Sequence, residues 1–237
     1  MADNSSCLIC KHTYCAKKVS LFSGFSDVDL AKVLSLIQRK TYEKGDVIFH
    51  EGDLCDQLLI VNDGSMKVFQ VSKEGKEQIL YILSEGDFLG DLNLLKKDVY
   101  RLSGAALEET HLCTIQKDDF DQLLASYPEL YLQVMSYAHD RIKDLELLVQ
   151  TLTTKDVESR LAVLLNRLAQ NFGVQKKEGI EIQLTLTREE MANFVGVTRE
   201  TVSRKLSSMQ ADGLIELYDN HMILIKDIGA MKRLAEV

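Results

Sequence analysis

Glu200, Ser203 and Arg204 are spaced three and four residues apart, so they share one face if residues 198–210 form a helix. On that face, the carboxylate can accept from a cytosine amino group, the guanidinium can fork onto guanine, and the hydroxyl can meet thymine or phosphate. Arg199 stands at the N-terminal end of the same segment. A salt-bridged helix in solvent can carry a similar sequence, so the surrounding elements decide between the two interpretations.

The surrounding sequence predicts that this segment is the second helix of a helix-turn-helix. Thr187 with Glu190 forms a capping box that starts a first helix, and residues 195–197 contain a glycine turn. An amphipathic helix over 157–172 precedes the pair, and residues 216–227 fit a hairpin. This order is that of a winged helix-turn-helix. The expected DNA contacts are Thr187, Arg188, Thr198, Arg199, Glu200, Ser203 and Arg204.

A long helix is predicted from Pro128 to Thr153, since proline suits the first turn of a helix. Its seam positions alternate in steps of four and three, which predicts a coiled-coil seam in a parallel dimer. The expected dimer interface is Val134, Ala138, Arg141, Leu145, Leu148 and Leu152. The alternative is that this stripe packs on the chain's own sandwich.

Short apolar runs broken by Gly and Asp precede the long helix. They cover residues 47–53, 57–72, 77–91 and 111–116, a spacing typical of an antiparallel sandwich or barrel. The turns at 62–64 and 73–75 both fit hairpins, and Ser26 caps a short helix that runs to Gln38.

We therefore expect an α+β chain in which a β-sandwich precedes a winged helix-turn-helix. The 237 residues, 46% of them hydrophobic, can fill one or two domains. The expected parts are a cysteine-bearing arm over 1–20, a sandwich sensor domain over 21–126, a dimerisation helix over 127–155 and a DNA-binding domain over 156–237.

The net charge of −8 disfavours nucleic acid as a partner of the chain as a whole. Residues 157–237 hold 11 basic and 11 acidic residues, so the whole net negative charge comes from the first 156 residues. No stretch approaches the roughly 20 apolar residues that span a bilayer, and the N-terminus lacks the apolar core of a secretory signal. We expect a cytoplasmic protein without a membrane partner.

In their order, these elements resemble the cyclic AMP receptor protein/FNR family of transcription regulators over nearly the whole chain. The most specific match is LTREEMANFVGVTRETVSRKLSSMQADGLI. The resemblance implies a cyclic-nucleotide-binding-like sandwich of the jelly-roll type and a homodimer on palindromic double-stranded DNA. Half-sites of the TTGAT or TGTGA kind are both implied, with RNA polymerase as a further partner.

One branch of this family binds cyclic nucleotides through a motif of the type G-E-L followed by R-S. Gly90, Asp91 and Arg101 fall at similar spacing here, so a small-ligand pocket around them is one alternative. Leu102 replaces the phosphate-binding hydroxyl, and residues 145–146 lack the hydroxyls that would hold adenine. A cyclic nucleotide is therefore disfavoured, and Arg101 is expected to pair with Asp91 or Asp87.

The FNR branch senses oxygen or redox state through cysteines. Cys7, Cys10, Cys15 and Cys113 resemble its ligand set of three clustered cysteines and one distant one, although the last N-terminal spacing is one residue shorter. The resemblance implies a 4Fe-4S cluster. Zinc with His12 as a possible donor, a reversible disulfide, or no cofactor remain open. Cys55 is interpreted as a small core hydrophobe.

No enzyme motif is present: there is no HExxH sequence and no Walker glycine loop. The favoured function is a DNA-binding regulator switched through its cysteines, in which ligation at Cys113 reorients the helices of a dimer. The alternatives are a regulator of the same fold switched by a ligand in the sandwich, and a constitutive DNA-binding dimer.

Overall fold

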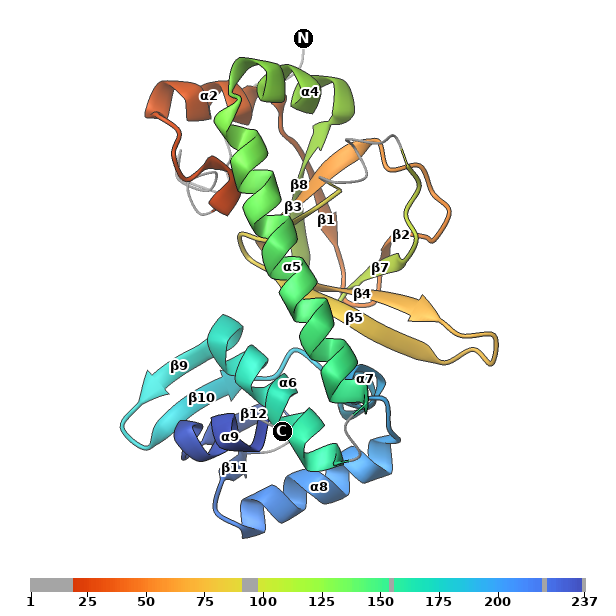
Figure 1. Cartoon of the computed structure of the whole chain (residues 1–237), viewed down its shortest axis with the longest axis vertical. Coiled ribbons are helices and arrows are strands. Elements are labelled where there is room, and N and C mark those ends of the chain that lie inside the picture. Colours follow the sequence, from red (N-terminus) through yellow and green to blue (C-terminus); the bar gives the residue numbers. More distant parts are fainter. Residues whose placement is uncertain (1–18, 91–97, 154–155, 219–220, 236–237) are drawn as a thin grey trace. The chain divides into compact units, whose positions relative to one another are not determined.

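The computed structural model describes residues 19–90, 98–153, 156–218 and 221–235 (Figure 1). The chain divides into two compact units, one of residues up to Val68 with Ile82–Arg141, the other of Phe69–Tyr81 with Ile142–Val237. None of the described helices is long and apolar enough to cross a membrane.

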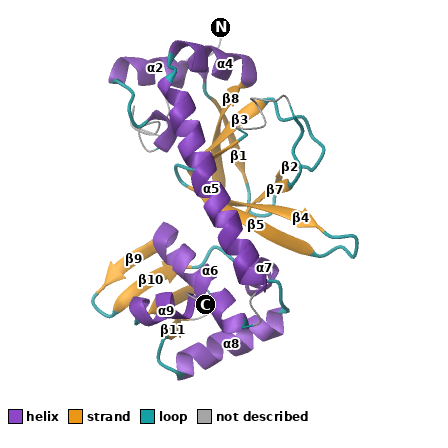
Figure 2. Cartoon of the chain, viewed as in Figure 1, coloured by secondary structure: helices purple, strands orange, loops and turns teal. Residues whose placement is uncertain are grey.

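The first unit is a β-sandwich with helices, as the sequence predicts (Figure 2). Its strands are β1 (Gln38–Tyr42), β2 (Val47–Phe49), β3 (Gln57–Asp63), β4 (Ser65–Val71), β5 (Glu77–Ser84), β6 (Phe88–Leu89), β7 (Ser103–Ala106) and β8 (Thr110–Gln116). They form two four-stranded sheets in the orders β1-β8-β3-β6 and β2-β7-β4-β5, and β4 and β5 continue into the second unit. The helices of this unit are η1 (Ser20–Phe22), α2 (Asp27–Leu36), α4 (Lys117–Ser126) and the first half of α5 (Glu129–Thr153).

The short helix expected from Ser26 is confirmed as α2, where the Ser26 hydroxyl accepts from the Asp29 amide. The sequence did not predict β1, β7, η1 and α4 of this unit, nor β9 (Gly173–Lys176) and α9 (Ile228–Ala235) of the second unit. Strand β1 is polar and mostly exposed, and β7 consists of small residues, so neither has the apolar alternation that marks a strand. Helix α4 separates Cys113 from the long helix and buries Phe120 and Leu124.

The hairpin expected at residues 62–64 is wrong, because β3 and β4 belong to different sheets. Gly64 has φ +81°, and a Cβ there would lie 2.4 Å from the Glu109 carbonyl oxygen. The turn therefore packs closely against the backbone before β8 while the chain crosses between the sheets. At 73–75 the hairpin is present, since β4 and β5 are neighbours and the Ser72 amide donates to the Lys76 carbonyl.

Helix α5 is confirmed, but the expected dimer seam on it needs correction. Val134, Ala138 and Leu148 are buried within the chain itself, at 1%, 5% and 6% exposure. Arg141 and Leu145 are half-buried, and the side chain of Leu152 lies outside the described residues. A stripe with this period suits the chain's own core as well as a partner helix, and here it packs against the chain's own core.

The second unit holds the helix-turn-helix and a four-stranded sheet of order β11-β12-β10-β9. Its further elements are α6 (Val157–Phe172), β9 (Gly173–Lys176), β10 (Gly179–Gln183), α7 (Arg188–Val195), α8 (Arg199–Ala211), β11 (Ile215–Tyr218), β12 (Met222–Ile225) and α9 (Ile228–Ala235). The expected wing hairpin is the β11-β12 pair, which is antiparallel. Its turn at 219–220 lies outside the described residues.

Candidate nucleic-acid interface and sensor residues

Helix α7 begins and ends as the sequence predicts. The Thr187 hydroxyl accepts from the Glu190 amide, and the Glu190 carboxylate accepts from the Thr187 amide in return. Gly196 ends the helix in the left-handed conformation with φ +71°, a geometry that glycine adopts without strain. These two caps fix both ends of the first helix of the motif.

Four of the residues expected to contact DNA lie on the exposed face of helix α8. Its N-cap is Thr198, whose hydroxyl accepts from the Thr201 amide. Exposed residues are Arg199, Glu200, Ser203 and Arg204, whereas Val202, Leu206 and Met209 are buried on the other side. The face that can enter a major groove is therefore polar and free of core contacts.

Ser207 extends this face and was missed in the sequence. It is exposed and stands seven residues after Glu200, so it lies two helical turns along the same face. The heptad spacing is the signal that could have found it. Its hydroxyl donates to the Ser203 carbonyl.

Two other basic residues of the motif, Arg188 and Lys205, contact side chains of the protein itself. Arg188 is half-buried, its Nη1 lies 3.4 Å from the Met191 Sδ, and burial lowers the pKa of its guanidinium. The Lys205 Nζ donates to the Glu158 carboxylate at 3.1 Å, which ties α8 to α6. Among the basic residues of α8, Arg199 and Arg204 are thus the exposed ones.

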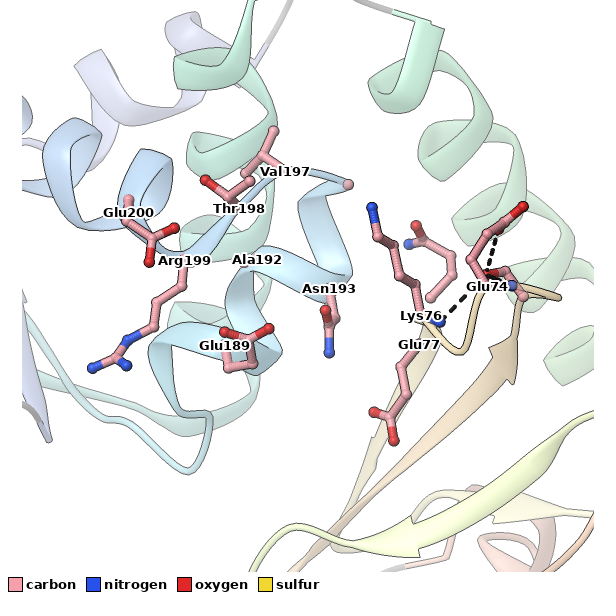
Figure 3. Close-up of a pocket in the computed structure, with 13 residues that line it drawn as sticks. Glu74, Lys76, Glu77, Glu189, Ala192, Asn193, Val197, Thr198, Arg199 and Glu200 are labelled. Atoms are coloured by element: carbon pink, nitrogen blue, oxygen red, sulfur yellow. Dashed lines mark hydrogen bonds between the residues drawn. The ribbon is translucent and has the colours of Figure 1, made fainter.

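A pocket of about 700 Å³ opens beside the start of α8 (Figure 3). It is lined by residues 72–78 and by residues of α7, the turn and the start of α8, all within the second unit. Its four carboxylates outnumber its two cations, so the pocket disfavours an anionic ligand. They come from Glu74, Glu77, Glu189 and Glu200, against Lys76 and Arg199.

Gly90 and Arg101, two of the three residues expected around a ligand pocket, differ in exposure. Gly90 is buried with φ +101°, and a Cβ there would lie 2.7 Å from the Gln57 carbonyl oxygen. The Arg101 side chain is 80% exposed and pairs with Asp98 at 3.2 Å, rather than with Asp87. Asp91 lies outside the described residues.

Cys113 lies in the middle of β8 and is 4% exposed. It pairs across the sheet with Arg39 of β1 and with Ile60 of β3, and Ile60 in turn pairs with Phe88 of β6. Directly paired residues project to the same side of a sheet. Cys113, Ile60 and Phe88 therefore form one row, called the Cys113 row below.

Phe88 at the end of the Cys113 row stacks on Tyr137 of α5, with ring centroids 3.9 Å apart. The Phe88 amide also donates to the Tyr137 hydroxyl at 3.3 Å. The row thus faces α5. Cys7, Cys10 and Cys15 lie outside the described residues, and the described part of the chain contains no group of three His, Cys, Asp or Glu that could hold a metal ion. Cys55 is buried, at 3% exposure.

Two family models match the chain. The cyclic nucleotide-binding domain matches residues 39–127, and the Crp-like helix-turn-helix domain matches residues 159–234. Electron transport regulator A of Shewanella oneidensis is 31% identical over 198 residues, which is 83% of this chain and 79% of that protein. This chain belongs to the CRP/FNR family.

Two further members of the CRP/FNR family are similar over most of their length. A CRP-like cAMP-activated global transcriptional regulator of Mycobacterium tuberculosis is 28% identical over 92% of this chain and 97% of its own. The Anaerobic regulatory protein of Pasteurella multocida is 28% identical over 89% of this chain and 77% of its own. The chain is thus a DNA-binding transcription regulator of the CRP/FNR family, a family of regulators rather than enzymes.

Proposed function

We propose that this CRP/FNR-family regulator is a cytoplasmic homodimer that binds a palindromic DNA site and is switched by oxygen or redox state through Cys7, Cys10, Cys15 and Cys113. The observation that carries the switch is the Cys113 row, which joins one of the four cysteines to the side of the sheet facing α5.

The dimer contact is assigned to the exposed apolar stripe of α5. Leu132, Met135, Ile142 and Val149 are 73%, 60%, 54% and 62% exposed. They occur at steps of three, seven and seven residues, which are a and d positions of one heptad series. Exposed large side chains in such a series lose contact with water when a second copy of α5 packs on them. This stripe replaces the seam predicted from the sequence.

The DNA site is read by the exposed face of α8. Glu200, Ser203 and Arg204 fit the FNR pattern, and residues 199–202 with Arg204 fit the cyclic AMP receptor pattern. TTGAT and TGTGA half-sites therefore remain the two candidates. A two-fold dimer places its two recognition helices about one helical turn of DNA apart.

A 4Fe-4S cluster fits the donor set, because four thiolates are the ligands that such clusters prefer. When bound, the cluster supplies a redox-sensitive centre. Cys113 is the one proposed ligand among the described residues, and its buried position in β8 shields the sulfur from solvent. The Phe88 ring at the end of the row transmits a shift of β8 to Tyr137, and so to the helix that carries the dimer stripe.

The test measures iron, acid-labile sulfide and the visible spectrum of protein purified without oxygen. We expect iron and sulfide near four per monomer in the wild type, with loss of both in Cys113→Ser. Cys55→Ser is the matched control, because Cys55 is buried to the same degree. Zinc in place of iron would indicate a structural or thiol-release site. Protein without metal whose DNA binding ignores oxygen would contradict the proposed switch.

A further inference from the structure

Arg160 of α6 bonds to the end of α7, although it lies 35 residues earlier in the chain. Its Nη1 donates to the Val195 carbonyl oxygen at 2.8 Å. Val195 is the last residue of α7, directly before Gly196. The Nε of Arg160 is buried and has no hydrogen-bond partner in the described part of the chain. Among the described residues, the guanidinium thus bonds to this carbonyl and to no acidic side chain.

The Val195 carbonyl is a group that needs an outside partner. The last four carbonyls of a helix have no partner within the helix, and that end carries a partial negative charge. The turn itself satisfies the Ala192 carbonyl, which accepts from the Gly196 and Val197 amides. A cationic donor is the favourable partner for Val195, because it satisfies the hydrogen bond and complements the helix dipole.

The position of this bond matters because Val195 is three residues before Thr198, the N-cap of α8. Arg199 and Glu200 follow at once, and both are exposed at the end of α8 that meets the bases. Hydrogen bonds to base edges weaken steeply when distance or angle departs from the optimum. A small shift of the turn therefore weakens base readout while leaving the charges on the surface in place.

We propose that Arg160 is a positioning residue for sequence-specific DNA binding: it holds the turn between α7 and α8 through the Val195 carbonyl and so sets where α8 presents its base-reading side chains. The inference rests on the DNA binding that membership of the family shows, and it does not depend on the proposed redox switch. Arg160 itself contacts protein backbone rather than bases, so it affects specificity more than overall affinity.

The experiment compares full-length wild type, Arg160→Met and Arg160→Lys on two duplexes. One is the duplex that the wild type selects from a randomised library, and the other is a scrambled duplex of the same composition. The quantity measured is the specificity ratio, which is the dissociation constant for the scrambled duplex divided by that for the selected duplex. Lys232→Met is the matched control, because Lys232 is an exposed cation of α9 in the same unit and its loss also removes one charge.

We expect Arg160→Met to lower the ratio about tenfold, a loss of the order of one charge-assisted hydrogen bond, with scrambled-duplex affinity close to that of Lys232→Met. Arg160→Lys should keep part of the ratio, because an ammonium can still donate to the carbonyl. Circular dichroism reports whether Arg160→Met is folded. If Arg160→Met is unfolded, the specificity ratio of Arg160→Lys becomes the deciding measurement. A wild-type ratio in the deciding variant would overturn the proposal, as would equal losses on both duplexes.

Discussion

At the scale of single residues, the best-defined prediction concerns Arg204. Its side chain is exposed on the same face as Glu200, four residues away. Arg204→Ala should cost about 1 to 3 kcal/mol of binding free energy on the preferred duplex and relax discrimination at one base position. Binding to a set of singly substituted duplexes measures this.

Arg101→Ala is the control for Arg204, because Arg101 is also an exposed arginine but belongs to the first unit. It should leave the preference for each base unchanged. An equal weakening of Arg204→Ala on every duplex would show instead that Arg204 contacts phosphate, because phosphate contacts carry no sequence information.

At the scale of elements, Asp156 makes the start of α6 sensitive to acid. Its carboxylate accepts from the Glu158 and Ser159 amides and from the Ser159 hydroxyl. Burial raises the pKa of Asp156, but these hydrogen bonds and the charge of Lys205 outweigh that effect and lower it below its ordinary value of 3.8. The stabilisation is therefore present above pH 3.8 and is lost as pH falls through the lower pKa of the folded state.

Asp156→Asn tests this sensitivity, because asparagine still caps a helix and does not titrate. Relative to the wild type, the variant should be slightly less stable at pH 7, and its amides at 158–160 should show a smaller rise in hydrogen-exchange opening between pH 5 and about pH 3, after correction for the intrinsic exchange rate. Identical changes with pH in the two proteins would contradict the role assigned to the Asp156 charge.

At the scale of the whole molecule, the revised dimer stripe gives a direct prediction. Leu132→Glu combined with Met135→Glu places two charges on the exposed stripe of α5. Losing two buried apolar side chains per chain should weaken the dimer by about 3 kcal/mol or more, at least a hundredfold in its dissociation constant. Light scattering after size-exclusion chromatography measures the mass.

The control is Val28→Glu, because Val28 of α2 is also an exposed apolar residue, at 70% exposure. This variant should leave the dimer intact. An unchanged mass for the double variant would refute the assignment of the dimer contact to the exposed stripe of α5.

The helix-turn-helix, the short helix at Ser26 and the existence of α5 could all be derived from the amino-acid sequence. The signals for these elements are local: Thr187 and Glu190 are three residues apart, and Gly196 lies within the turn that it makes possible. A cap or a glycine acts on backbone groups within a few residues, so its effect can be derived without knowledge of the rest of the fold. For the same reason the exposed polar face of α8 could be predicted, apart from Ser207.

Three features could not be derived without the three-dimensional fold: which sheet each strand joins, which face of α5 is exposed, and which groups contact Arg101 and Cys113. The apolar residues of α5 fit two stripes, and the fold buries Val134 on the chain's own core while Leu132 stays exposed. Likewise Gly64 indicates a turn but not that β3 and β4 join different sheets, nor that the turn lies against the backbone of residues 109–110. These outcomes depend on contacts between residues far apart in the sequence, which hydrophobic periodicity does not encode.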